Sequence, residues 1–361
     1  MHFSASLFGF ALGCLVALAL TPLAGRLGRR PEFTDQPTPR KLHLKEHPQL
    51  GGLALLGAFA LSFLGILIAF PDARGVTAGF ARALLPSAAL VAVSGLIDDL
   101  QPKSPWKKLS IQLLAVALLQ LQLDVLGLGR SGMVADLTVW LGAGMALLWI
   151  LGLSNAMNLI DGIDGLAAGI SIISGVGLLS LAWAVGESSV AIASAILIGS
   201  AFGFLRSNIH PAKIFMGDMG SLFLGFVLAV LGTTIYWSRP ALTTLAALVL
   251  VAWIPLMDVL YAIVRRMRAK RSIFSPDVSH LHHRLLRVGL SHRMAALLLC
   301  GIGSITAAAG VGIVRDRHPW AWALAVLVAT LPLAWALAGR SARSVATRWK
   351  DSEKQPVGPQ A

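Results

Sequence analysis

The sequence predicts an all-α integral membrane protein with about eleven transmembrane helices. Of its 361 residues, 56% are hydrophobic and only 13% are charged, whereas a soluble domain is about 45–50% apolar and about 25% charged. The mean hydropathy is +0.74, and about eleven apolar runs approach the roughly 20 residues that cross a bilayer. These observations exclude an ordinary soluble globular protein, a disordered chain and a disulfide-stapled scaffold.

The predicted spans follow one another along almost the whole chain. The first apolar run has no basic segment before it and no small-residue cleavage site before Arg26, so it is interpreted as a retained span and not a signal peptide. The ninth run is interpreted as one span with Asp258 deep inside it, as a helix-packing or hydrogen-bonded residue. The runs lie at about residues 4–24, 50–70, 82–97, 109–126, 134–153, 165–185, 189–205, 219–237, 241–264, 294–314 and 320–338.

The distribution of lysine and arginine predicts the orientation. The connections after the odd-numbered spans, together with the C-terminal tail, carry 24 of the 30 basic residues, and the other connections carry 6. Because cytoplasmic loops are enriched in Lys and Arg, the N-terminus is expected outside and the C-terminus in the cytoplasm. The same rule accounts for the net charge of +13, so no nucleic-acid partner is expected. Residues 1–340 form the predicted membrane domain, and residues 341–361 form a polar cytoplasmic tail that is predicted to be disordered.

Five aspartates are predicted to lie at helix ends on the cytoplasmic side. Asp98 and Asp99 end the third run, Asp161 and Asp164 follow the fifth, and Asp218 begins the eighth. Ionised groups at the edge of a bilayer are expensive and indicate function. A single aspartate could equally cap a helix, but three acidic motifs on one face indicate a site.

This acidic set predicts a metal-dependent reaction. Adjacent carboxylates repel one another unless a cation lies beside them, and oxygen ligands suit Mg²⁺, with Mn²⁺ as the alternative. Mg²⁺ is usually held by one or two carboxylates together with waters and substrate phosphates. Asp218 and Asn158 are therefore the expected ligands of an open site.

A histidine-rich segment, His280-Leu281-His282-His283-Arg284, follows the ninth run. A zinc site is disfavoured because no cysteine lies nearby and the neighbouring residues are basic. Imidazole and guanidinium donors together suit a phosphate, and a solvated basic loop would not explain three clustered histidines. An acidic metal site beside a basic lobe at a membrane face predicts phosphoryl transfer from a diphosphate, with a lipid as the expected second partner.

The motifs taken together resemble a known family, the polyprenyl-phosphate N-acetylhexosamine-1-phosphate transferases of glycosyltransferase family 4, to which the MraY, WecA and TagO enzymes belong. The histidine segment is similar to that of the WecA and TagO branch. In order, the matching motifs are Asp35-x-Pro37 with Arg40-Lys41-x-His43, Gly51-Gly52, Asp98-Asp99, Asn155-x-x-Asn158-x-x-Asp161-Gly-x-Asp164-Gly165, Phe215-Met-Gly-Asp218-x-Gly-Ser221 and His280-x-His-His.

The resemblance implies a reaction in the bacterial inner membrane. A UDP-N-acetylhexosamine, with UDP-GlcNAc as the first expectation, would donate its sugar-1-phosphate to undecaprenyl phosphate, and UMP would leave. The product would begin a cell-envelope glycan such as an O-antigen, the common antigen, a teichoic acid or an exopolysaccharide. A homodimer is left open.

The resemblance also implies catalytic and metal-binding roles. Asp98, Asp99 and Asp218 would be catalytic, with Asp98 positioning or deprotonating the lipid phosphate. Asp218 and Asn158 would hold Mg²⁺. Because the second pKa of a phosphate monoester is about 6, the acceptor is largely ionised at neutral pH. Direct attack of the lipid phosphate is therefore favoured over a covalent aspartyl intermediate.

Further roles concern the nucleotide sugar. By the same resemblance, Asp161, Asp164 and Phe215 would lie in the nucleotide region, with Phe215 stacking on uracil. The diphosphate and the sugar would be held by Lys45, His280, His282, His283 and Arg284.

Two alternatives are kept. The first is the same reaction with another UDP-N-acetylated hexosamine or deoxyhexosamine as the donor. The second is a solute or ion transporter that uses the carboxylates as a pathway, which would place charges near the bilayer midplane.

Overall fold

The protein is described by a computed structural model over residues 2–35, 46–101, 104–125, 137–272 and 279–315, with isolated positions between 320 and 330. Within these ranges the chain is helical apart from turns and one pair of two-residue strands. The elements are α1 (His2–Leu27), η1 (Pro31–Phe33), β1 (Thr34–Asp35), β2 (His47–Pro48), α2 (Gly51–Ala69), η2 (Pro71–Ala73), α3 (Arg74–Leu100), α4 (Pro105–Val125), α5 (Leu137–Ile160), α6 (Leu166–Val185), α7 (Ser188–Asn208), α8 (Gly217–Ser238), α9 (Leu242–Val251), α10 (Trp253–Arg268), α11 (Leu281–Arg287) and α12 (His292–Arg315).

The helices agree with the predicted membrane class. Among the described residues, seven helices are long and apolar enough to cross a membrane, or eight if the bent pair α9–α10 is one span. Helices α4 and α5 occupy the predicted fourth and fifth spans. The predicted eleventh span at 320–338 lies mostly outside the described residues, and the predicted tail lies wholly outside them. The protein is therefore a multi-pass, all-α membrane protein, while the count of eleven stays a prediction.

Helices α1 and α7 pack closely because both carry small residues. Gly13 on α1 lies against the backbone of Ile196, and Gly203 on α7 lies against the carbonyl group of Cys14. Small residues let two helix backbones approach in a bilayer, where burial of apolar surface gives no advantage over lipid. The buried positions of α1 recur about every fourth residue and are Ala5, Ser6, Gly9, Gly13, Ala17, Thr21 and Ala24.

The predicted span at residues 241–264 is not one continuous helix. The chain breaks at Ala252, and α9 and α10 are bent by 83°. Pro255 is the cause, because it has no N–H to donate to the carbonyl group of Val251 and its ring clashes with that group. Ser174 on α6 donates a 2.8 Å hydrogen bond to the Val251 oxygen, so the freed acceptor is satisfied inside the protein, as a bilayer requires.

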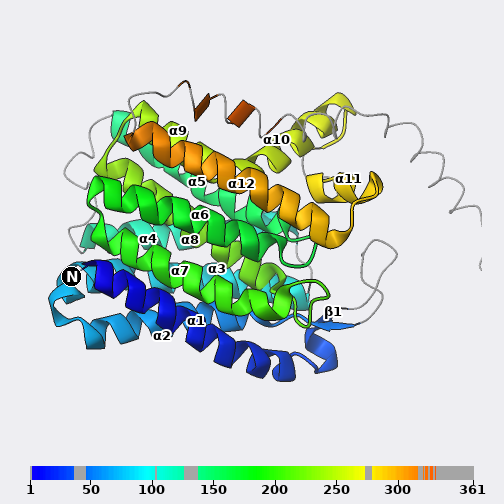
Figure 1. Ribbon diagram of the computed structural model, residues 1–361, viewed down its shortest axis with the longest axis horizontal. Coiled ribbons are helices and arrows are strands. Elements are labelled where there is room, and N and C mark those ends of the chain that lie inside the picture. Colours follow the sequence, from blue (N-terminus) through cyan, green and yellow to red (C-terminus); the bar gives the residue numbers. More distant parts are fainter. Residues whose placement is uncertain are drawn as a thin grey trace, which may run out of the picture.

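The polar elements gather at one end of the helices. In Figure 1, α11 and β1 lie at the end opposite the N-terminus. Helix α8 is buried over almost its whole length and is flanked by α3 and α5. Strands β1 and β2 pair antiparallel, with Thr34 opposite Pro48. The chain therefore brings the start of α8 to the same end as the connections after α1, α3 and α5.

Candidate active site

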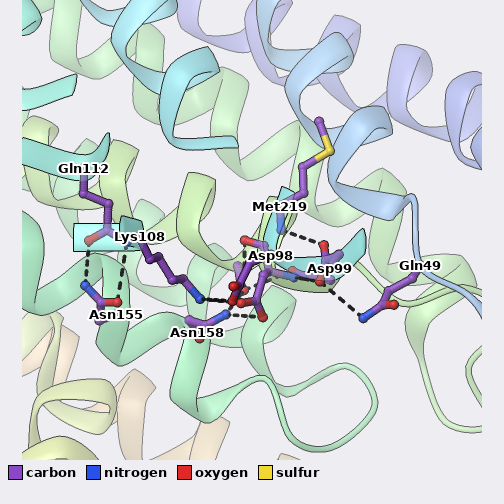
Figure 2. Close-up of polar contacts among 11 residues, drawn as sticks. Gln49, Asp98, Asp99, Lys108, Gln112, Asn155, Asn158 and Met219 are labelled. Carbon is purple, nitrogen blue, oxygen red and sulfur yellow. Dashed lines mark hydrogen bonds and ion pairs between the residues drawn. The ribbon is translucent and has the colours of Figure 1, made fainter. Parts of the chain in front are cut away.

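Lys108, at the start of α4, joins two of the predicted acidic motifs. Its Nζ lies 3.1 Å from Asp98 Oδ2 at the end of α3 and forms a second ion pair with Asp218 Oδ2 at the start of α8. Figure 2 shows the lysine side chain extended from α4 toward Asp98. A cation between two carboxylates offsets their mutual repulsion, so Lys108 supplies the compensating charge that the acidic motifs require.

Asn158, at the end of α5, completes this contact. Its Nδ2 donates to Asp218 Oδ1 at 2.7 Å and to Ser221 Oγ at 2.9 Å. Four helices therefore converge at Asp218, because polar side chains at the ends of α3, α4 and α5 gather around the first turn of α8. The structure brings together Asp98, Asn158 and Asp218, as the sequence predicted.

Asp99 faces a different partner from Asp98. Its Oδ1 accepts a hydrogen bond from the backbone N–H of Asp218 at 2.9 Å, and its Oδ2 accepts one from Met219 at 3.1 Å. Gln49 Nε2 adds a third donor at 3.3 Å. A carboxylate that accepts from the first N–H groups of a helix caps it and favours the positive end of the helix dipole. Asp99 thus fixes the start of α8 and the direction of Asp218. Figure 2 shows Asp99 with its partners Met219 and Gln49.

The Gly-Gly motif supports the same turn from the other side. Gly51 N–H donates to the Phe215 carbonyl and Gly52 N–H to the Met216 carbonyl, both at 2.9 Å. The ring of Phe215, predicted to stack on uracil, is half-buried and lies 4.7 Å from the His47 ring, centroid to centroid. The segment before α2 and the segment before α8 therefore form one hydrogen-bonded unit.

Asp161 experiences the negative charge of the whole cluster. Burial first, and then the charges of Asp218, Asp99 and Asp164, raise the pKa of Asp161 to about 8. A raised carboxyl pKa means that an additional negative charge is unfavourable at this place. A cation close to Asp161 would therefore be favoured.

Asp164 holds the connection that leads into α8. Its Oδ2 lies 2.7 Å from Nδ1 of His210 and accepts from the backbone N–H of Ala212 at 3.0 Å. Asn208 Oδ1 accepts from the Gly165 N–H at 3.1 Å. Asp164, predicted to bind the nucleotide, thus holds the 209–216 connection by hydrogen bonds. It lies three residues after Asp161.

The histidine segment forms the short helix α11 and meets the acidic segment after α5. His282 is 2% exposed, and burial followed by the nearby His283 and His280 lowers its pKa well below the usual value. The rings of His282 and His283 are 4.2 Å apart. Gly162 lies so close to His282 that any Cβ atom there would overlap the ring. Two motifs about 120 residues apart in the sequence thus lie side by side.

Sequence reasoning missed Lys108, Gln112 and Tyr261. Gln112 lies one turn after Lys108 and exchanges amide hydrogen bonds with Asn155, at 2.8 and 3.5 Å. The signal was present, because a basic and a polar residue four positions apart share a face of an otherwise apolar helix. Tyr261 accepts a 2.9 Å hydrogen bond from Arg284. Asp258 is hydrogen-bonded, as predicted, but to α11. Lys45 lies outside the described residues.

The donor set is compatible with Mg²⁺. Within the described ranges no group of three or more His, Cys, Asp or Glu side chains is arranged to hold a metal ion. Mg²⁺ does not need one, because one or two carboxylates suffice when substrate phosphates and waters complete the shell. Asp218 and the side-chain carbonyl oxygen of Asn158 would be such ligands, and the negative charges of Asp218, Asp99 and Asp164 around Asp161 would favour a cation nearby.

Comparison with known proteins gives consistent relatives. The sequence model of a family described as glycosyl transferase family 4 matches residues 81–236. A probable undecaprenyl-phosphate N-acetylglucosaminyl 1-phosphate transferase of Bacillus subtilis is 35% identical over 86% of this chain and 85% of its own length.

Two further relatives come from other bacteria. The decaprenyl-phosphate N-acetylglucosaminephosphotransferase of Mycobacterium tuberculosis H37Rv is 34% identical, over 81% of this chain and 78% of the relative. The undecaprenyl-phosphate alpha-N-acetylglucosaminyl 1-phosphate transferase of Escherichia coli K12 is 28% identical, over 84% and 83%. The motif at Pro37 and Arg40–His43 lies outside the described residues, and the other matching motifs gather at one end of the helices. The chain belongs to glycosyl transferase family 4, the polyprenyl-phosphate hexosamine-1-phosphate transferases.

Proposed function

We propose that the protein transfers GlcNAc-1-phosphate from UDP-GlcNAc to undecaprenyl phosphate and releases UMP. One observation carries the proposal. Lys108, Asp98, Asn158 and Asp218 meet in direct polar contact at the end of the helices that also holds the histidine helix α11 (Figure 1). The names of the three relatives support the same chemistry for those proteins.

The metal would be held by Asp218 and Asn158. When bound, Mg²⁺ supplies positive charge to the diphosphate and stabilises the charge that develops on the leaving phosphate. Asp99 holds the start of α8 through the backbone N–H groups of Asp218 and Met219. The capping contact thus fixes where the carboxylate of Asp218 points.

The lipid phosphate would bind beside Asp98 and Lys108. A phosphate oxygen attacks the β-phosphorus of the donor, and the bond from that phosphorus to the bridging oxygen breaks, so the electron pair leaves with UMP. Because the acceptor phosphate is largely dianionic at neutral pH, it needs no strong base. Lys108 attracts the phosphate, and Asp98 directs Lys108 through their 3.1 Å ion pair.

The donor would lie across the gap between the acidic and basic halves. His280, His282, His283 and Arg284 offer imidazole and guanidinium donors to the diphosphate and the sugar. His282 is ready for this role, because both of its ring nitrogens are buried without a hydrogen-bond partner in the described structure. A buried polar group without a partner is costly, so a ligand that bonds to it gains affinity.

The location follows from the charge distribution. We propose a multi-pass protein of the bacterial inner membrane, with the site on the cytoplasmic face, where UDP-sugars are available. The 24 to 6 division of basic residues supports this orientation. Homodimer formation and the glycan that the product begins stay open.

The test is a transfer assay with the purified full-length protein. We expect undecaprenyl phosphate, Mg²⁺ and UDP-GlcNAc to give UMP and a lipid whose mass equals undecaprenyl-diphosphate-GlcNAc. A panel of UDP-N-acetylated hexosamines and deoxyhexosamines identifies the preferred donor. Product with another sugar only would replace the donor assignment, and absence of UMP release with every donor would overturn the transferase proposal.

The same assay separates the transporter alternative. A transporter needs charged groups along the membrane path, whereas the described carboxylates of the site meet at one end of the helices. Solute uptake into vesicles in the absence of UMP release would favour transport.

A further inference from the structure

Helix α10 presents two polar side chains to the histidine helix. Asp258 and Tyr261 are three residues apart and therefore share one face of α10. Asp258 is 1% exposed, and its two oxygens face the start of α11. We propose that Asp258 and Tyr261 are positioning residues that hold the histidine segment in register against the donor site. This inference rests on the proposed transferase function.

The Asp258 carboxylate contacts two successive residues. Oδ1 accepts from the backbone N–H of Leu281 at 2.7 Å, and Oδ2 lies 2.6 Å from Nδ1 of His280. A buried carboxylate is tolerated only when its oxygens are satisfied in this way. The contact also assigns the hydrogen of a neutral His280 ring to Nδ1, so Nε2 remains for the site.

The second anchor is Tyr261. Its hydroxyl accepts a 2.9 Å hydrogen bond from Arg284 Nη1, and the Arg284 guanidinium lies 4.8 Å from the centre of the Tyr261 ring. A guanidinium over an aromatic face is attracted to it. Arg284 is one turn after His280, so the first turn of α11 is held at both ends.

These anchors matter because α11 cannot position itself. It has seven residues, and helices shorter than about 12–15 residues are marginal on their own. His282 lies between the two anchored positions, with its ring against Gly162. The position of the His282 ring, whose two nitrogens have no hydrogen-bond partner in the described structure, therefore depends on α10. Helix α10 begins after the bend at Ala252.

The experiment uses full-length protein in nanodiscs and two variants, Asp258→Asn and Tyr261→Phe. The KM values for UDP-GlcNAc and for the lipid are measured separately, together with binding of UDP-GlcNAc by calorimetry. We expect the KM and Kd for UDP-GlcNAc to rise about 10-fold for Asp258→Asn, the size of one lost charge-assisted hydrogen bond, and about 3-fold or more for Tyr261→Phe, while the lipid KM changes less than about 2-fold.

Matched controls are present in the chain. Tyr236→Phe changes the other tyrosine of the chain. Asp72→Asn changes an exposed aspartate in η2. Both controls should leave both KM values unchanged. An equal loss of kcat at unchanged KM in Asp258→Asn and Tyr261→Phe would indicate general destabilisation and would overturn the positioning role.

A readout independent of turnover is the ¹⁵N spectrum of the His280 ring. In Asp258→Asn an amide N–H faces Nδ1, so the ring hydrogen should move to Nε2 and the two ¹⁵N signals should exchange their positions. An unchanged His280 spectrum would overturn the positioning role. Absence of transfer by the unaltered enzyme would instead overturn the proposed function. If Asp258→Asn does not fold, Tyr261→Phe carries the same KM test.

Discussion

Gly162 lies directly against the imidazole of His282, with no room for a side chain between the backbone and the ring. This contact joins the connection after α5 to the helix α11. It predicts that Gly162→Ala displaces His282 and lowers kcat/KM for UDP-GlcNAc by about 10-fold or more, because a shift of about 1 Å in a binding group can cost as much as 100-fold. Steady-state kinetics with varied donor measure it.

The control for this substitution is Gly152→Ala. Gly152 lies on α5 and has open space where the Cβ atom of an alanine would lie. Alanine there should therefore leave kcat/KM unchanged. Equal kinetics for both alanine variants would contradict the proposed place of His282 at the donor.

Substitutions of Asp98 and Asp99, at the end of α3, should differ in their effects on stability and on UMP release. Asp99→Ala removes the acceptor of two backbone N–H groups of α8, so we expect a loss of about 1–2 kcal/mol of stability together with activity. Asp98→Asn should abolish UMP release with little change in Tm. Thermal unfolding and UMP assays on the same samples test this, and a larger Tm loss for Asp98→Asn would reverse the assignment.

Lys108 should be essential as a charge. Lys108→Ala leaves Asp98 and Asp218 without their shared cation, and we expect kcat to fall by about 10²–10³-fold, as for loss of other preorganised charges. Lys107→Ala, one residue earlier and exposed, is the matched control and should keep near-normal activity. Turnover of Lys108→Ala within a few-fold of the unaltered enzyme would remove Lys108 from the mechanism.

The metal assignment predicts a particular dependence on Mg²⁺. Chelation of divalent ions should abolish transfer, and Mg²⁺ should restore it. Asp218→Asn should raise the Mg²⁺ concentration for half-maximal rate by about 10-fold or more, because a ligand charge is lost. Near-normal activity of Asp218→Asn at low Mg²⁺ would show that the metal is bound elsewhere.

Asp161 predicts how stability depends on pH. Its pKa rises from 3.8 to about 8, mainly by burial, so the folded protein holds a proton that the unfolded chain has already lost. The stability contributed by the protonated form is complete below pH about 4 and is lost as the pH rises to about 8.

Asp161→Asn removes this loss of stability at high pH, because asparagine does not ionise. In metal-free buffer its Tm advantage over the unaltered protein should therefore grow between pH 5 and pH 9. Asp72→Asn, at an exposed position, should show no such trend. Parallel Tm profiles for Asp161→Asn and the unaltered protein would contradict the raised pKa.

The sequence predicted that Asp98, Asn158 and Asp218 lie together, because these residues occur in motifs at the ends of long apolar runs. Asp98, Asn158 and Asp218 could be assigned to one membrane face from charge counting alone. Lys108 was missed because one lysine beside a span is normally explained by the positive-inside rule. Its pairing with Asp218 depends on how α4 packs beside α8, which no local pattern encodes.

The basic half was harder to place. The bend at Ala252 depends on Pro255 and on the distant Ser174. The Ser174 hydroxyl donates a hydrogen bond to the carbonyl oxygen of Val251. Proline alone is compatible with a straight or kinked bilayer helix, so hydropathy indicated one continuous span. For the same reason Asp258 was expected deep in that span, whereas it lies after the bend and contacts α11.

The bend at Ala252 divides the enzyme into two parts that can change independently in evolution. The carboxylates of the site lie at the end of α3 and the start of α8, whereas the histidines of α11 are held by α10, which departs by 83° from α9. Under the proposed roles, substitutions in α10 would change donor binding while the carboxylates at α3 and α8 stay in place. One scaffold could in this way diversify toward many surface polymers.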